Sequence, residues 1–229
     1  MTDVDVPLPG GRTTAGVVRR GDTVLRPVGE NSGFVHELLL YLEKQRFCGA
    51  PQFLGLDSSG HEILSFLPGQ VPDELGDFSR VQLVAAARLL RSFHDATAGS
   101  PLAGSSEVVC HGDASPCNCV FVDGMPTALI DFDAAHPGTR DEDLGYATWL
   151  WLDLGNPELA PEFQGQRIAE FFRAYGADPT RAVPAIRSAQ SQLAAGRQAP
   201  SATQLWARQC SQWLEVHSGT LSRILVEAW

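Results

Sequence analysis

Basic residues are scarce in this sequence. It has 17 Lys and Arg against 27 Asp and Glu, a formal net charge of -10, and a pI near 5.0. Because the phosphate backbones of nucleic acids attract Lys and Arg, this balance argues against a nucleic-acid-binding protein. The same negative charge suits a cationic small-molecule ligand.

Cysteine and long apolar runs are also scarce. Five cysteines in 229 residues do not make a disulfide scaffold, and they indicate a reducing compartment. No run of about 18 apolar residues occurs, and no basic stretch leads into an apolar segment near Met1. We therefore expect a soluble, cytoplasmic protein without membrane contact, and the sequence leaves its oligomeric state open.

Several common catalytic motifs are missing. There is no Gly-x-Ser-x-Gly elbow of a serine hydrolase, no His-Glu-x-x-His zinc motif and no Gly-x-x-x-x-Gly-Lys-Ser/Thr phosphate loop. Hydrophobic residues make up 44% of the chain, which is enough for a packed core. A globular protein is predicted, with any chemistry carried by another motif.

The most informative stretch is residues 108–133. Short apolar runs bounded by Gly, Pro and Asp predict strands over residues 108–110, 119–122 and 128–132. Two polar clusters lie at the ends of these strands, where loops can hold side chains in place for chemistry. The first cluster contains His111, Gly112, Asp113 and Asn118, and the second contains Asp131 and Asp133.

The spacing of these polar residues points to phosphoryl transfer. Protein kinases place their base and a metal-binding Asn five positions apart in His-Arg-Asp-x-x-x-x-Asn, and residues 111–118 read His-Gly-Asp-x-x-x-x-Asn. With the Ile-Asp-Phe-Asp that follows, this loop resembles the aminoglycoside phosphotransferase family of small-molecule kinases. The resemblance implies an α+β, protein-kinase-like fold of two lobes. Residues 1–67 would form a small β-rich N-lobe, and residues 68–229 a mostly helical C-lobe.

The resemblance also implies roles for the motif residues. Asp113 would be the catalytic base, with His111 in the same catalytic loop, and Asn118 and Asp131 would bind Mg²⁺. The family places an Asp-Leu pair where its carboxylate supports the catalytic loop, which assigns that role to Asp143. A carboxylate at a helix start is also favoured by the helix dipole, so Asp143 has a second explanation.

Asp133 and His94 have other expected roles than the motif residues. Asp133 stands where kinases have Gly, and it could help to hold a second Mg²⁺ or an adjacent loop. His94 lies on the apolar face of a predicted helix, so we expect a packed, hydrogen-bonded core histidine rather than a ligand.

Nucleotide-binding residues follow from the same resemblance. Gly10 and Gly11 would form a turn near the phosphates, although the full Gly-x-Gly-x-x-Gly is absent. Arg26 replaces the usual strand lysine, and a guanidinium can still grip two phosphate oxygens. Glu37 is the favoured helix partner of Arg26, with Glu43 as the alternative.

The predicted hinge between the lobes consists of Ser65, Phe66 and Leu67. Backbone groups of Ser65 and Leu67 would hydrogen-bond adenine, and Phe66 would lie beside it. The nucleotide would be ATP, with GTP not excluded. The other elements expected are hairpins at 15–26 and 52–67, a helix over 33–46, a helix from Asp77 or Ser79 to Ala96, and helices over 144–154, 162–175, 180–195 and 202–227.

Two functions are consistent with this pattern. The first is an ATP- and Mg²⁺-dependent phosphotransferase that acts on a hydroxyl of a small molecule, such as an aminoglycoside or another antibiotic. The second is a catalytically silent kinase-like module that binds a nucleotide or a protein. Arg26 and the thin glycine turn favour the second, and the intact metal ligands favour the first.

Overall fold

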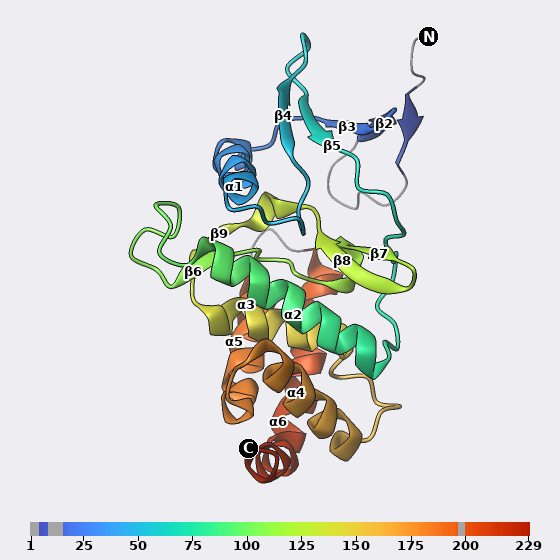
Figure 1. The fold of residues 1–229 in the computed structure, drawn as a ribbon. Helices are drawn as coiled ribbons and strands as arrows, with labels where there is room; N and C mark the ends of the chain where they lie inside the picture. The colour runs from blue at the N-terminus through green and yellow to red at the C-terminus, as the bar shows by residue number, and fades with distance from the viewer. Residues whose placement is uncertain (1–4, 9–15, 197–199) are drawn as a thin grey trace.

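A computed structural model describes residues 5–8, 16–196 and 200–229. At one end of the molecule lies a five-stranded antiparallel sheet in the order β1-β2-β3-β5-β4 (Figure 1). Its strands are β1 (Val6–Pro7), β2 (Val18–Arg20), β3 (Thr23–Arg26), β4 (Phe53–Leu56) and β5 (Glu62–Ser65). Both predicted hairpins therefore contribute to one sheet, because β3 pairs with β5.

One helix, α1 (Ser32–Lys44), connects β3 to β4. Its buried side chains Val35, Leu38, Leu39 and Leu42 recur at the i, i+3, i+4 and i+7 positions of one helix face. The helix predicted over 33–46 is confirmed, and this apolar face explains why it packs rather than frays.

The next helix is α2 (Arg80–Thr97), which lies between the sheet and the C-terminal helices (Figure 1). Ser79 caps it in a capping box, in which the side chains of Ser79 and Gln82 each bond the other's backbone N–H. Of the two predicted caps, Ser79 is the one observed. The apolar face of α2 is buried, and it includes His94.

Two short antiparallel strand pairs carry the polar motif. β6 (Val108–Cys110) pairs with β9 (His136–Gly138), and β7 (Cys119–Val122) pairs with β8 (Met125–Leu129). The strands at 108–110 and 119–122 are confirmed. The strand predicted over 128–132 is wrong at both ends, since β8 already begins at Met125. It ends at Leu129 because Asp131 has a left-handed backbone (φ 62°) and Phe132–Ala134 form a 3-10 turn. Asp is one of the few non-glycine residues that adopt this conformation readily.

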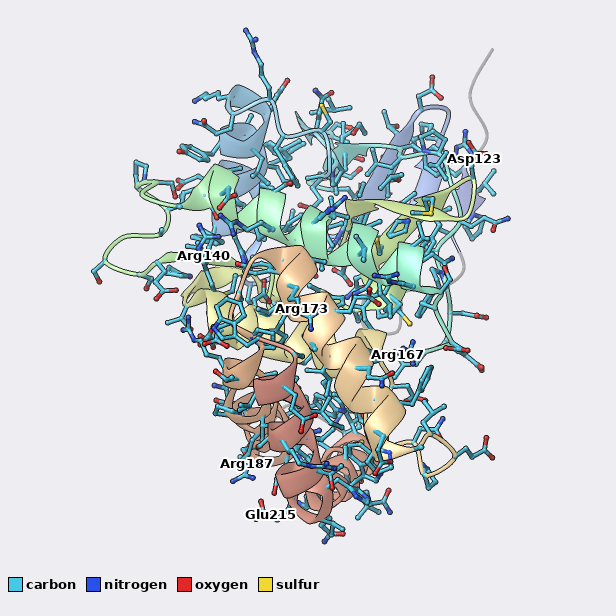
Figure 2. The ribbon with its side chains drawn as sticks, turned by 60° about the horizontal axis from the view of Figure 1, so that its bottom comes forward. Asp123, Arg140, Arg167, Arg173, Arg187 and Glu215 are labelled. Carbon is cyan, nitrogen blue, oxygen red and sulfur yellow. The ribbon has the colours of Figure 1, made fainter. Side chains whose placement is uncertain are left out.

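The rest of the chain is helical. The helices are α3 (Arg140–Trp151), α4 (Pro161–Tyr175), α5 (Ala182–Ala195) and α6 (Ser201–Glu227). α3 begins four residues before the predicted start because Thr139 caps it through the backbone N–H of Glu142. An ion pair of 2.8 Å between Arg187 and Glu215 joins α5 to α6 at the end of the molecule away from the sheet (Figure 2).

Together these elements confirm the predicted α+β class. All strands of the five-stranded sheet precede Leu67, as does α1, and the other α-helices follow it. Trp149 is fully buried and stacks on Trp206 with 4.7 Å between ring centroids, so these aromatics belong to the helical core. No helix in the described ranges is long and apolar enough to cross a membrane.

Candidate active site

The loop after β6 turns sharply at Gly112. Its φ is +79°, and a Cβ there would collide with the carbonyl oxygen of Ala134. Both facts require glycine, because other residues avoid positive φ and no side chain fits against this backbone. The close approach brings the loop that holds Asp113 against the loop that holds Asp131.

Replacing Gly112 with Ala is expected to destabilise the protein by more than about 2 kcal/mol, since the left-handed conformation alone costs a non-glycine residue about 1–2 kcal/mol. Gly124→Ala is the matched control: its φ is +75°, but nothing lies within 4 Å of the added Cβ. Urea unfolding should show a larger loss for Gly112→Ala than for Gly124→Ala. Equal losses would mean that the contact with Ala134 is unimportant.

Asp113 lies half-buried at the end of this loop. The hydroxyl of Tyr146, on α3, donates to Asp113 Oδ1 at 2.9 Å. Burial raises the pKa of Asp113 above its usual value, and the hydrogen bond from Tyr146 partly offsets this rise. A carboxylate with a raised pKa and one oriented oxygen is suited to accept a proton. Tyr146 was not predicted, although it lies one helical turn from Asp143.

Tyr146→Phe is expected to move the acid limb of the pH–activity profile to higher pH. The lost hydrogen bond stabilises the ionised carboxylate of Asp113, so its removal raises the pKa of that group. Above the limb, the turnover number should fall by less than about tenfold, because one hydrogen bond contributes roughly 1 kcal/mol. Tyr41→Phe, on α1, is the control and should leave the profile unchanged. An unshifted limb in Tyr146→Phe would show that Asp113 does not set it.

His111 is fully buried, so its ring braces the loop and lies away from solvent. Its Nε2 lies 3.0 Å from the carbonyl oxygen of Ile130, and its Nδ1 is 3.3 Å from the backbone N–H of Asp113. An imidazole with its proton on Nε2 satisfies both contacts. His111 thus ties the Asp113 loop to the residue before Asp131.

Asn118 and Asp131 lie on adjacent segments. The backbone N–H of Ile130 donates to the carbonyl of Asn118 at 2.9 Å, and the side-chain amide of Asn118 donates to the carbonyl of Asp113 at 3.0 Å. This second bond uses the amide nitrogen and leaves Asn118 Oδ1 for another contact. The structure therefore brings together the three residues predicted to surround a metal–nucleotide complex.

Arg26 reaches this cluster from the end of β3. Its Nη1 donates to Asp131 Oδ1 at 3.3 Å, and its Nη2 donates to Asp133. Although burial disfavours the charged guanidinium, Asp133, Asp131 and Glu62 outweigh this effect and raise the pKa of Arg26. The guanidinium of Arg26 therefore lies where the two carboxylates of the Asp-Phe-Asp segment meet, and its binding of phosphate stays a prediction.

The predicted pairing of Arg26 with Glu37 is wrong. Glu37 is exposed on α1, and Arg26 Nε lies 2.8 Å from Glu62 Oε1 on β5. α1 contributes His36, whose Nε2 lies 2.6 Å from Glu62 Oε2. Helix periodicity turns Glu37 to solvent and His36 inward, and the pairing of Arg26 with Glu62 across β3 and β5 supplies the carboxylate.

A second contact joins the sheet end of the molecule to the Asp131 loop. The side-chain amide of Asn31 donates to the carbonyls of Asp133 and Ala135, each at 2.9 Å. No motif marked Asn31, because its partners lie more than 100 residues away. The side chain of Asp133 contacts Arg26, which is neither of the two roles considered for it, and a role in holding a second Mg²⁺ stays a prediction.

The hinge residues are partly engaged within the sheet. The Ser65 N–H donates to the carbonyl of Gln52 at 2.9 Å, and the Phe66 N–H donates to the carbonyl of Asp22 at 2.8 Å. These two amides are therefore not free to bind adenine. Leu67 and Ser65 line a cavity of about 290 Å³ beside the end of α1. The predicted Gly10–Gly11 turn lies outside the described residues.

Asp143 supports the loop of residues 111–113, as predicted. It is 1% exposed, and its two oxygens accept the backbone N–H groups of His111 and Gly112 at 2.8 and 3.0 Å. Burial raises its pKa, but His94 and the bond from His111 outweigh this and hold the pKa below its usual value. His94 is the predicted core histidine, and its Nε2 lies 3.0 Å from Asp143 Oδ2.

The network continues from His94 to the surface. His94 Nδ1 lies 2.6 Å from the hydroxyl of Tyr175, which accepts a 3.3 Å hydrogen bond from Arg140. Arg140 also pairs with Asp95 at 2.9 Å, at the junction of α2 and α3 (Figure 2). Four side chains from three helices thus hold the loop through Asp143.

Comparisons with known proteins agree with this geometry. Residues 100–185 match the phosphotransferase enzyme family (APH), a span that contains the loops of Asp113 and Asp131 and the start of α3. The trifolitoxin immunity protein of Rhizobium leguminosarum bv. trifolii is 36% identical over 167 residues. That alignment covers 66% of this chain and 63% of the relative, so the chain matches less than two thirds of its length.

Solved structures share the fold over nearly the whole chain. A choline/ethanolamine kinase family protein from Mesorhizobium loti has a TM-score of 0.62 at 16% identity, covering 98% of this chain and 92% of that one. The aminoglycoside phosphotransferase APH(3'')-Id from Streptomyces rimosus, solved with ADP and streptomycin, has a TM-score of 0.58 at 13% identity, covering 90% and 92%. Residues 100–185 are thus similar to the phosphotransferase enzyme family (APH), and the solved structures confirm the predicted protein-kinase-like fold.

Proposed function

We propose that this protein is a small-molecule kinase that transfers the γ-phosphate of ATP to a hydroxyl group. One observation carries the proposal: hydrogen bonds link Asp113 to Asn118 and Asn118 to the residue before Asp131. The Asn118 side chain donates to the carbonyl of Asp113, and the Asn118 carbonyl accepts from the N–H of Ile130. In this proposal Asp113 orients the acceptor hydroxyl and takes its proton as the bond to phosphorus forms. General-base catalysis of this kind contributes roughly 10²- to 10⁴-fold.

The residues present fit a magnesium ion. Asn118 and Asp131 offer the amide and carboxylate oxygens that Mg²⁺ prefers. The guanidinium of Arg26 lies between Asp131 and Asp133, and this supports the view that their carboxylates attract a cation. Asn118 and Asp131 would hold the ion, and a bound Mg²⁺ would offset the negative charge that develops on the phosphates.

The nucleotide would lie between the sheet and the catalytic loops. We propose that Arg26 binds phosphate oxygens in place of the usual lysine, and that residues 1–67 and 68–229 act as two lobes. Because the amides of Ser65 and Phe66 are engaged, adenine would use the backbone of Leu67. Glu62 and His36 would orient Arg26 from behind.

The acceptor would be a hydroxyl compound that carries positive charge. The net charge of -10 favours such a molecule, and the related structures are named for choline, ethanolamine and aminoglycoside kinases. One relative is named as a trifolitoxin immunity protein. The same chemistry could therefore serve to protect the producing cell against a toxin.

The test is phosphate transfer from labelled ATP by the purified protein, with Mg²⁺ and a panel of acceptors. The panel contains aminoglycosides, choline, ethanolamine, sugars, nucleosides and trifolitoxin, and mass spectrometry identifies the product. A phosphorylated acceptor that requires Asp113 supports the proposal. Nucleotide binding without transfer to any acceptor and without slow ATP hydrolysis would instead support the silent kinase-like module.

A further inference from the structure

A second group of side chains that could bind a metal ion lies at the β6–β9 pair and the first turn of α3. Cys110 Sγ, a ring nitrogen of His136 and a carboxylate oxygen of Glu142 all lie within 4.8 Å of one another. Cys110 is buried, while His136 and Glu142 are partly exposed. The cluster therefore has one protected side and one side open to solvent.

Strand pairing explains why these residues converge. Cys110 and His136 are directly opposite each other across β6 and β9, and residues at such positions have their Cβ atoms about 4.5–5.5 Å apart. α3 begins two residues after β9, and its capped first turn presents Glu142. No spacing motif in the sequence predicted this group, because its members come from three separate elements.

The orientation of His136 leaves its second nitrogen available. Nδ1 lies 2.8 Å from the carbonyl oxygen of Ala134, so Nδ1 carries the proton and donates it. Nε2 lies 3.3 Å from Glu142 Oε1, so a proton on Nε2 would join the ring to the carboxylate. A metal ion can take the place of that proton, which is then released to solvent. Metal-binding histidines commonly use this arrangement, with the other ring nitrogen bonded to a carbonyl.

Gly138 keeps the space between the ligand atoms open. A Cβ at this position would lie 2.7 Å from Cys110 Sγ and 2.9 Å from Glu142 Oε2. Any other residue would therefore push the thiol and the carboxylate apart. The requirement for glycine here comes from the available space.

We propose that Cys110, His136 and Glu142 form a binding site for a divalent metal ion of the zinc class. Sulfur, nitrogen and oxygen ligands together suit Zn²⁺ or Co²⁺ and not Mg²⁺, which separates this site from the one at Asn118 and Asp131. Three protein ligands leave a fourth position for water on the exposed side. On binding, the thiol gives up the hydrogen bond to Thr139 and releases its proton to solvent as the metal–sulfur bond forms.

The site would brace the catalytic loop. Cys110 immediately precedes His111, and Glu142 immediately precedes Asp143, which holds that loop. A metal ion would thus join the strand before the loop to the helix that supports it, and would reinforce the β6–β9 pairing.

Cobalt spectroscopy on the full chain tests the proposal. The purified protein is freed of metal with a chelator and titrated with Co²⁺, and we expect a thiolate-to-cobalt charge-transfer band with the visible bands of tetrahedral cobalt. Cys110→Ser, His136→Asn and Glu142→Gln should each weaken or abolish this spectrum, whereas Cys48→Ser, at an exposed cysteine, should retain it. A missing charge-transfer band in the wild type would overturn the proposal, as would a band lost in Cys117→Ser and kept in Cys110→Ser.

Thermal unfolding gives a second measurement that does not depend on replacing the buried cysteine. Zn²⁺ should raise the Tm of the wild type in a saturable way, because a ligand that binds only the folded state stabilises it. His136→Asn keeps the buried thiol and should lose this response. An equal Zn²⁺ response in His136→Asn would contradict the assignment.

Discussion

Asp113→Asn is expected to lower the turnover number for phosphate transfer by about 10²- to 10⁴-fold, which is the usual contribution of a general base. Asn has the shape of Asp and can still contact Tyr146, but it cannot take the proton of the acceptor hydroxyl. The affinity for MgATP should change little, because Asn118 and Asp131 remain. Initial rates at saturating ATP and acceptor give the measurement.

Asp123→Asn is the matched control for this replacement. Asp123 is exposed at the turn between β7 and β8, and its φ of 51° is tolerated by Asn (Figure 2). It should retain wild-type activity. If Asp113→Asn is as active as Asp123→Asn, then Asp113 is not the base.

Asp143→Ala has the largest expected effect on stability and should lower the free energy of unfolding by about 3–5 kcal/mol. This is the usual loss when one partner of a buried ion pair is removed. The replacement leaves two buried backbone N–H groups, of His111 and Gly112, and the ring of His94 without their acceptor. Because folded proteins are stable by only about 5–15 kcal/mol, this variant should unfold at much lower urea concentration.

Asp141→Ala provides the control from the same helical turn. Asp141 pairs at 2.5 Å with Arg181 near the surface, and an exposed pair of this kind contributes about 0–1 kcal/mol. Similar losses for Asp141→Ala and Asp143→Ala would mean that the buried network does not hold the loop.

The same network has a defined pH dependence. The pKa of Asp143 is lower in the folded protein than in the unfolded chain, so the folded state binds this proton less tightly. Its contribution to stability is therefore full above the unfolded pKa and is lost as the pH falls through the folded pKa. Acid unfolding of Asp143→Ala should accordingly be less steep than that of the wild type.

Local sequence patterns predicted the parts of the fold whose causes are local. The stripe of α1, the Ser79 cap of α2 and the strands at 108–110 and 119–122 follow from periodicity and capping, which depend on residues a few positions apart. The end predicted for the third strand, at residue 132, was wrong because the pattern of apolar residues does not reveal the left-handed backbone at Asp131.

Contacts between distant segments could not be predicted in the same way. Arg26 pairs with Glu62 and not with Glu37 because β3 lies beside β5 in the sheet. The register of these two strands could not be predicted from the sequence. The convergence of Cys110 with His136 likewise depends on β9, which no pattern indicated. Asp113, Asn118 and Asp131 were predictable because their motif has a fixed spacing.

The most direct test of the central claim does not need the acceptor. Calorimetric titration with ATP should show binding that depends on Mg²⁺, and Asp131→Asn should weaken it by at least about tenfold while Asp113→Asn retains it. ATP binding that is equal with and without Mg²⁺, or that is unchanged in Asp131→Asn, would contradict a metal–nucleotide site at Asn118 and Asp131.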